Sequence, residues 1–227
     1  TIYSTAFLFK IFGSSYFLLR FVSVLMLFIS AAILFLLLRD IYNLKLAIFG
    51  SILYLSSPIL LIQSHLALEN IALLPFVIFW FLMIYRFEKK RKNKYLIWAG
   101  LSLGLSFYSY NGMRLIMPIL ALLSFGYIFF LNSYLFKKSW TGFKFFFLGL
   151  IPFLLLFLIS QNKYPGAIFG NRSPDEIHSY QQFLLPYLSS FDPSFLFILG
   201  DTTPYHSTGL HGIFLLATLP LFLAGLY

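Results

Sequence analysis

Residues 64–70 have the sequence SHLALEN and put an imidazole, a carboxylate and an amide between two almost continuous apolar runs. The run before them covers residues 44–63 and the run after them covers residues 71–85. Each is long enough for a membrane-spanning helix once the polar stretch is divided between the two. On a helix, His65 and Glu69 would be four residues apart and on the same face. Since polar groups are costly at the mouth of apolar helices, this stretch predicts either a water-facing helix end or a site at the membrane surface.

The composition of the chain is that of a membrane protein. Of its 227 residues, 60% are hydrophobic and only 10% are charged, whereas about a quarter of the residues in a soluble domain are charged. The chain therefore cannot cover itself with a polar surface, and we expect lipid to be its solvent. It has no cysteine, so the protein ligands of any metal ion would have to be His, Asp or Glu.

Seven segments have the length and apolar character to cross a hydrocarbon core of about 30 Å. They cover residues 17–38, 44–64, 66–85, 95–108, 115–131, 143–159 and 209–227. Residues 1–12 predict an interfacial helix before them. The predicted fold class is all-α: a polytopic transmembrane helical bundle of about seven spans, forming one partial domain over residues 1–227. Because the sequence starts at Thr1 and stops within an apolar segment, we interpret it as an internal piece of a longer protein.

The loop at about 160–210 predicts short amphipathic helices on the membrane surface. Ser173, Pro174 and Glu176 fit a capping box at the start of one helix, and apolar residues at helical spacing continue it to residue 188. Asp192 and the proline after it predict a second short helix over residues 195–199 that stops at a glycine.

The basic residues predict how the bundle is oriented. With alternating spans, 11 of the 16 Lys and Arg residues fall on one side. They are Arg39, Lys45, Arg86, Lys89, Lys90, Arg91, Lys92, Lys94, Lys137, Lys138 and Lys144. The positive-inside rule assigns that side to the cytoplasm of a plasma or inner membrane. The same distribution argues against nucleic acid as a partner, because it is the pattern of a topology signal near anionic lipid.

The other polar groups gather on the opposite side. All four histidines, His65, His178, His206 and His211, fall there, as do five of the seven acids, Glu69, Asp175, Glu176, Asp192 and Asp201. A protein without an external function would have little reason to separate its titratable groups in this way. We therefore expect the active site to face the extracytoplasmic side.

Three polar clusters on that side are candidate sites. The first contains His65, Glu69 and Asn70, the second is the turn at residues 108–114 with Tyr110 and Arg114, and the third is the loop at residues 200–211 with Asp201, His206 and His211. Arg114 would either snorkel to the water or bind an anion. The histidine spacing matches no metal-binding helix motif, the serines show no nucleophile elbow, and no phosphate-binding glycine loop is present. An arginine beside carboxylates suits a phosphate-bearing lipid headgroup.

Four sequence motifs resemble a known family. Phe12-Gly13 with FLLRFVS at residues 17–23 is similar to its "FG…xxRxxS" pattern, and LSSP at 55–58 with QSHLALE at 63–69 is similar to "SP…SRxAxxE", with His65 in the place of arginine. Residues 108–118 resemble "YxYxxxRxxxP", and residues 200–226 resemble "GD…H…G…PxxxxGL". The family is the C-type superfamily of polytopic glycosyltransferases, in the branch of dolichyl-phosphate-mannose protein mannosyltransferases and bacterial aminoarabinose transferases.

The resemblance implies transfer of a sugar from a polyprenyl-phosphate donor to an acceptor at the outer face, with membrane lipid around it. It implies catalytic carboxylates at Glu69 and Asp201, and substrate-binding groups at His65, Asn70, Tyr110, Arg114, His206 and His211. The family's principal catalytic aspartate would lie before Thr1, so we expect this piece to be inactive alone. No residue is assigned to a metal, although a divalent ion stays open as a cofactor. A transporter or lipid flippase and an outer-face polysaccharide polymerase or ligase are the alternative functions.

Overall fold

The computed structural model describes residues 2–67, 69–131, 136–164, 166, 179–201 and 210–226. In these ranges the chain forms helices and no strand, which confirms the all-α prediction. The elements are α1 (Ile2–Phe12), α2 (Tyr16–Ile41), α3 (Leu44–Leu55), α4 (Pro58–His65), η1 (Glu69–Leu73), α5 (Leu74–Lys90), α6 (Lys94–Ser109), α7 (Met113–Leu131), α8 (Phe136–Lys163), α9 (Tyr180–Ser189), α10 (Pro193–Phe197), η2 (Leu216–Thr218) and α11 (Leu219–Leu226).

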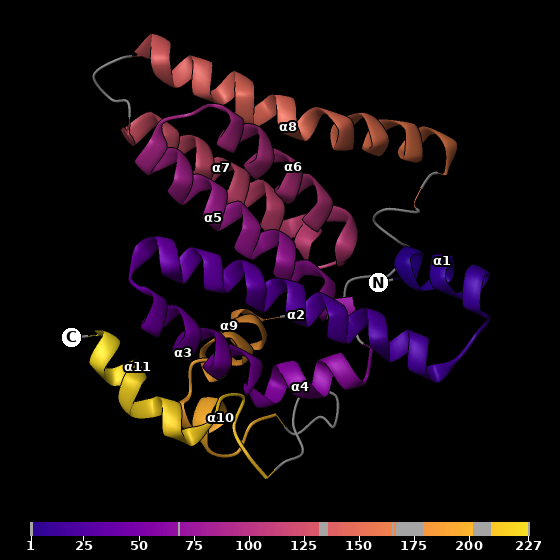
Figure 1. Ribbon diagram of the computed structural model, residues 1–227, viewed down its shortest axis with the longest axis vertical. Helices are drawn as coiled ribbons and strands as arrows, with labels where there is room; N and C mark the ends of the chain where they lie inside the picture. The colour runs from indigo at the N-terminus through magenta and orange to yellow at the C-terminus, as the bar shows by residue number, and fades with distance from the viewer. Residues whose placement is uncertain are drawn as a thin grey trace.

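Helix α2 runs through the middle of the bundle, with α5–α8 on one side and α3, α4 and α9–α11 on the other (Figure 1). It packs directly on α3 and α5, and α6 packs on α5, α7 and α8. Helix α2 therefore lies between the group of α5–α8 and the group of α3, α4 and α9–α11.

Local sequence explains where several helices begin and end. The side chain of Ser15 accepts a hydrogen bond from the backbone N–H of Leu18 at 3.2 Å and caps α2. Asn43 caps α3 in the same way. Pro58 occupies the first turn of α4, where its missing N–H costs nothing. Arg91 ends α5 in a left-handed conformation with φ of 52°.

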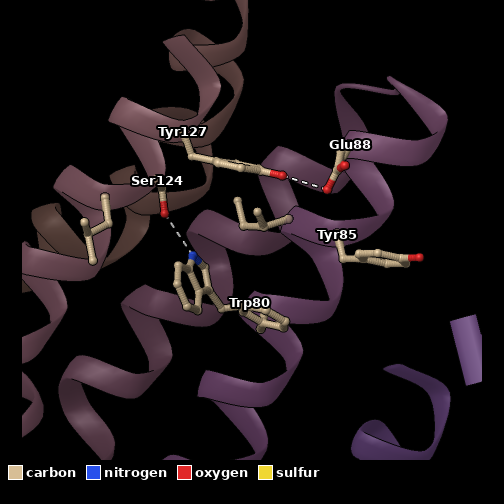
Figure 2. Close-up of a pocket in the computed structure, with 8 residues that line it drawn as sticks. Trp80, Tyr85, Glu88, Ser124 and Tyr127 are labelled. Atoms are coloured by element: carbon tan, nitrogen blue, oxygen red, sulfur yellow. Dashed lines mark hydrogen bonds between the residues drawn. The ribbon is translucent and has the colours of Figure 1, made fainter. Parts of the chain in front are cut away.

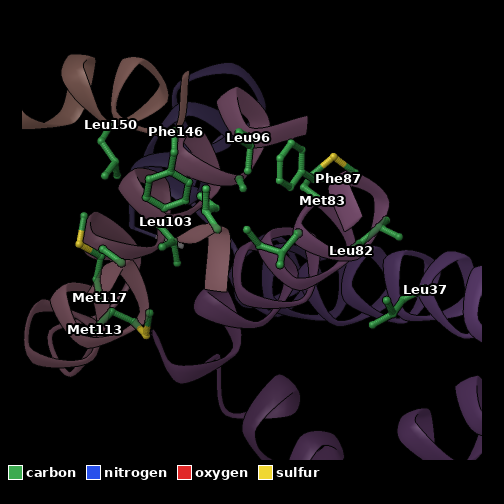
Figure 3. Packing of buried hydrophobic residues seen from close by; sticks show 14 residues of the cluster. Leu37, Leu82, Met83, Phe87, Leu96, Leu103, Met113, Met117, Phe146 and Leu150 are labelled. Carbon is green, nitrogen blue, oxygen red and sulfur yellow. The ribbon is translucent and has the colours of Figure 1, made fainter. Parts of the chain in front are cut away.

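The largest buried cluster lies between α5, α6, α7 and α8 and includes Leu82, Leu103 and Phe146 (Figure 3). Two glycines bring α6 and α8 into backbone contact. A Cβ atom at Gly100 would collide with the carbonyl oxygen of Phe146, and one at Gly149 would collide with the carbonyl oxygen of Ile97. Small residues that let two backbones meet are typical of packing between helices in membranes.

The helices fit a multi-pass membrane protein, but the described residues do not reproduce seven spans. Four segments are long and apolar enough: α2, η1 with α5, α7 and α8. Helices α3 and α4 make a fifth span if they are counted together, although they are bent by 55° at the break before Pro58. Helix α6 has only 16 residues, or about 24 Å, and α11 has 8. The predicted span at 209–227 is therefore not one continuous helix in its described part.

The polar stretch at 64–70 differs from its prediction. Helix α4 ends at His65, Ala67 adopts a left-handed conformation with φ of 56°, and Glu69 begins η1. His65 and Glu69 therefore do not lie on one helical face. The chain bends on both sides of α4: by 55° before Pro58, and again at Ala67 after the helix ends. Residues 44–73 therefore do not form one straight helix.

The predicted surface helices are found in part. Helix α9 lies within the range expected for the first, whereas its predicted capping box at residues 173–176 lies outside the described residues. The second is α10, which begins two residues earlier than predicted because Asp192 accepts a hydrogen bond from the backbone N–H of Ser194 at 2.8 Å.

The two ends of the bundle are defined by contacts between helix ends. Arg86 near the end of α5 pairs with Asp40 near the end of α2, at 2.7 Å between Nε and Oδ2. We call this the basic end, because Lys45 and Lys89–Lys94 adjoin it in the chain. We call the opposite end the Glu69 end, where η1 packs on α2 and α6. The start of α2, helix α1 and the end of α8 lie at the Glu69 end (Figure 1).

Candidate functional site

Glu69 lies in a pocket at the Glu69 end. The pocket has a volume of about 340 Å³ and is formed by α1, the first turns of α2 and the break before η1. Its lining residues are Thr5, Ala6, Phe9, Leu19, Ser23, Ala67 and Glu69, and we call it the Glu69 pocket. The left-handed Ala67 directs the chain out of α4 so that Glu69 starts a new helix at the pocket wall.

Only three of the residues that line the Glu69 pocket have polar side chains: Thr5, Ser23 and Glu69. Ser23 is fully buried, and its Oγ has no hydrogen-bond partner among the described residues. Thr5 is also buried, whereas Glu69 is exposed. A serine on an apolar helix usually bonds to the carbonyl of the preceding turn, and a buried hydroxyl without a partner costs free energy. The pocket therefore has a carboxylate at its exposed rim and, buried in its wall, a hydroxyl whose hydrogen-bonding capacity no described residue uses.

The other two members of the first cluster, His65 and Asn70, do not line the Glu69 pocket. The Nδ1 atom of His65 is 2.8 Å from the backbone oxygen of Leu61, so this nitrogen bonds to the histidine's own helix. The ring is exposed, and Asn70 is half-buried in η1. His65 is not among the residues that line the Glu69 pocket.

The second cluster forms the turn between α6 and α7 at the same end of the bundle. Tyr110 ends α6 in an extended conformation, and its carbonyl accepts from the N–H of Met113 at 3.1 Å. A Cβ atom at Gly112 would lie 2.5 Å from the Tyr110 ring, so glycine is required for this ring position. Arg114 is half-buried, and its charge acts on Tyr108, whose hydroxyl donates to the carbonyl of Phe153 at 3.0 Å. The guanidinium is therefore close enough to Tyr108 for its charge to act on that residue.

Residues 213 and 214, which follow the third cluster in the chain, lie against α10 and the start of α4. The backbone N–H of Phe214 donates to the carbonyl of Leu196 at 2.8 Å, and the N–H of Ile59 donates to the carbonyl of Ile213 at 3.4 Å. His211 bonds to the carbonyl of its neighbour Gly212 at 2.9 Å.

Asp201 is half-buried and follows Gly200, which has φ of 71°. His206 lies outside the described residues. His211 is therefore two residues from the contact of Ile213 with the beginning of α4, while Glu69 follows the end of that helix.

The structure therefore places Glu69 with α1 and α2, and of the two histidines that it describes, neither His65 nor His211 lines the Glu69 pocket. Among the described residues no three His, Asp or Glu side chains are grouped so that they could hold a metal ion. Sequence reasoning missed Thr5 and Ser23 as pocket residues. Ser23 is the serine that ends the FLLRFVS motif, so the resemblance marks its position, but no pattern in the sequence shows that it lines a pocket.

These features define a class: a multi-pass helical membrane protein with a carboxylate pocket at one end of the bundle. Residues 1–159 match the dolichyl-phosphate-mannose-protein mannosyltransferase family. The chain belongs to this family and is a membrane glycosyltransferase of the C-type superfamily. No curated protein and no solved structure gives a significant match.

The family assignment favours the glycosyltransferase over the transporter, flippase and polymerase alternatives. The matched range contains Glu69 and Arg114 and ends before Asp201, His206 and His211. The first two clusters therefore belong to the part of the chain that defines the family, and the third does not.

Proposed function

We propose that this chain forms part of an enzyme that moves a sugar from a polyprenyl-phosphate donor to an acceptor at the extracytoplasmic membrane face. The single observation that carries the proposal is the Glu69 pocket, which is lined in part by α1 and belongs to the range matched by the family. A lipid-linked sugar has its hydrocarbon in the membrane and its sugar at the surface. A pocket with apolar walls and a carboxylate at its rim suits that division.

The proposed roles follow from the chemistry of the side chains. The Glu69 carboxylate accepts hydrogen bonds from sugar hydroxyls or takes the proton of the acceptor hydroxyl as a general base. As the acceptor oxygen bonds to the sugar, the bond from the sugar to the lipid phosphate breaks and the phosphate leaves with its charge. Arg114 would stabilise that phosphate, because a guanidinium matches the geometry of two phosphate oxygens.

The remaining site residues have supporting parts in this proposal. His65, Asn70 and Tyr110 would contact the donor from the segments next to Glu69 and Arg114. Asp201, with His206 and His211, would act from the loop that follows α10, Asp201 as a second carboxylate.

The distribution of charge supports the assignment of the Glu69 end to the extracytoplasmic side. Asp40 and Glu88 are the acids nearest the basic end, and Arg86, Lys89 and Lys90 lie beside them in the chain or in space. A basic end of this kind faces the cytoplasm in most multi-pass proteins. The opposite end, with the pocket, would then face outward.

The test is Glu69→Gln in the intact protein, assayed for sugar transfer from a polyprenyl-phosphate donor. We expect turnover to fall by about 10²-fold or more, because the amide can neither take a proton nor carry the charge. The matched control is Asp192→Asn, which retains the cap of α10 because Asn caps as well as Asp. Equal, full turnover in both variants would remove Glu69 from the site.

A further inference from the structure

A groove between α5 and α7 lies in the half of these helices nearer the basic end. It has a volume of about 350 Å³, and Trp80, Tyr85 and Glu88 of α5 line it together with Ser124 and Tyr127 of α7 (Figure 2). The Glu69 pocket shares none of these residues. The lining of the groove between α5 and α7 is mostly apolar, and Phe81 and Leu123 at the edges of this groove are 49% and 61% exposed. An apolar groove with such edges opens to the acyl chains of the bilayer.

Two hydrogen bonds fix the walls of the groove. The indole N–H of Trp80 donates to Ser124 Oγ at 3.0 Å, and the hydroxyl of Tyr127 donates to Glu88 Oε2 at 2.6 Å (Figure 2). Ser124 in turn donates to the carbonyl of Leu120 at 2.8 Å. The polar groups are thus satisfied by one another, and the space between the helices keeps an apolar surface of fixed shape.

Cations border the groove at its basic end. The Lys89 Nζ lies 5.5 Å from the centre of the Tyr85 ring, and the charge of Arg91 acts on Tyr127. Both residues follow Glu88 closely at the end of α5. The hydroxyl of Tyr85 donates to the backbone oxygen of Asp40 at 3.0 Å, so Lys89 flanks the groove on the side of α2. A phosphate at the membrane surface beside the groove would lie near the end of α5 that carries both cations.

We propose that the groove binds one anionic phospholipid of the leaflet that faces the basic end. One acyl chain lies along the apolar wall beside Trp80, and the phosphate lies between Lys89 and Arg91. Glu88 is the carboxylate in the lining, and it repels an acidic headgroup from the interior of the groove. The headgroup therefore stays at the mouth, where the cations are. This lipid site is separate from the donor site of the proposed function.

Trp80 allows a direct test of binding. The chain has three tryptophans, so Trp98→Phe with Trp140→Phe leaves Trp80 as the sole reporter in the intact protein. The protein is placed in phosphatidylcholine bilayers that contain increasing amounts of either brominated phosphatidylglycerol or brominated phosphatidylcholine, whose bromines quench nearby indoles. We expect half-maximal quenching at an about 30-fold lower fraction of the brominated anionic lipid, since two cations near the surface each contribute about 1 kcal/mol.

Trp98 provides the internal control, because it is 52% exposed on α6 and does not line the groove. With Trp80→Phe and Trp140→Phe, we expect the two brominated lipids to quench Trp98 equally. A preference of the same size at Trp98 would mean a general attraction of anionic lipid to the protein, and would overturn the groove site.

Charge-matched variants test the headgroup. Lys89→Gln with Arg91→Gln should abolish the lipid preference of Trp80, whereas Lys90→Gln with Lys92→Gln removes the same charge from exposed neighbours and should retain it. Loss of the preference in both pairs, or in neither, contradicts the proposal. Displacement of brominated phosphatidylglycerol by an equal amount of polyprenyl phosphate would also contradict it, because the groove would then be a site for the isoprenoid.

Discussion

The acids at the two ends of the bundle are used differently. At the basic end, Asp40 pairs with Arg86 at 2.7 Å and Glu88 accepts from Tyr127 at 2.6 Å, so both carboxylates join one helix to another. At the other end, Glu69 lines an open pocket together with Ser23, whose hydroxyl has no hydrogen-bond partner among the described residues. Paired acids stabilise the arrangement of helices, whereas the Glu69 carboxylate is the group to which we assign a ligand in the proposed function.

Mutation of the close contact between α6 and α8 should have the largest effect on stability. Gly149→Ala would place a Cβ atom against the α6 backbone, and we expect it to lower the free energy of unfolding by about 2–3 kcal/mol. Gly126→Ala is the matched control, since nothing lies within 4 Å of its Cβ position and alanine favours helices. The measurement is unfolding in mixed micelles by a denaturing detergent. Equal effects of the two substitutions would show that α6 and α8 can separate without cost.

Two serines of α2 allow a paired hydroxyl to be compared with one that is unpaired among the described residues, because both serines are fully buried on the same helix. Ser30 Oγ donates to the carbonyl of Leu27 at 2.7 Å and bonds to the Tyr54 hydroxyl at 2.9 Å. Ser23 Oγ has no such partner among the described residues. If the substrate bonds to that hydroxyl, as the proposed function suggests, we expect Ser23→Ala to lower kcat/KM for sugar transfer about tenfold with no loss of stability, because the hydroxyl has no internal hydrogen bond to lose among the described residues.

Ser30→Ala should do the opposite. We expect it to lower the free energy of unfolding by about 1 kcal/mol and to leave transfer unchanged, since its hydrogen bonds are internal. Transfer assays and detergent unfolding of both variants give the four values needed. If Ser23→Ala changes only stability, the Glu69 pocket is a packing feature and not a binding site.

The sequence predicted the helical class and the polar break at residues 64–70, because apolar runs interrupted by charge are read reliably from composition. It did not predict that Ala67 is left-handed, since alanine favours helices and no Gly or Pro marks the turn. The assumption of a continuous helix then put His65 and Glu69 on one face, which is wrong. Helix propensity is a local quantity, whereas this break is imposed by packing of η1 on α2, α4, α5 and α6.

The candidate site was predictable only in its charged members. Glu69 was identified because a carboxylate between apolar runs is costly and therefore conspicuous. Thr5 and Ser23 were not, because neutral hydroxyls are common on membrane helices and usually bond to their own backbone. Which hydroxyl lacks a partner depends on the contact of α1 with α2, and that contact leaves no periodic signal in the sequence.

The smallest expected effect concerns the ion pair at the basic end. Asp40→Asn removes the charge that pairs with Arg86, and we expect it to lower the free energy of unfolding by about 1 kcal/mol because both side chains are about a quarter exposed. Transfer activity should not change, since this pair lies at the opposite end from Glu69. Asp192→Asn serves again as control and should alter neither quantity. A loss of transfer in Asp40→Asn without loss of stability would mean that the basic end also takes part in the reaction, and the division between a stabilising end and a ligand-binding end would fail.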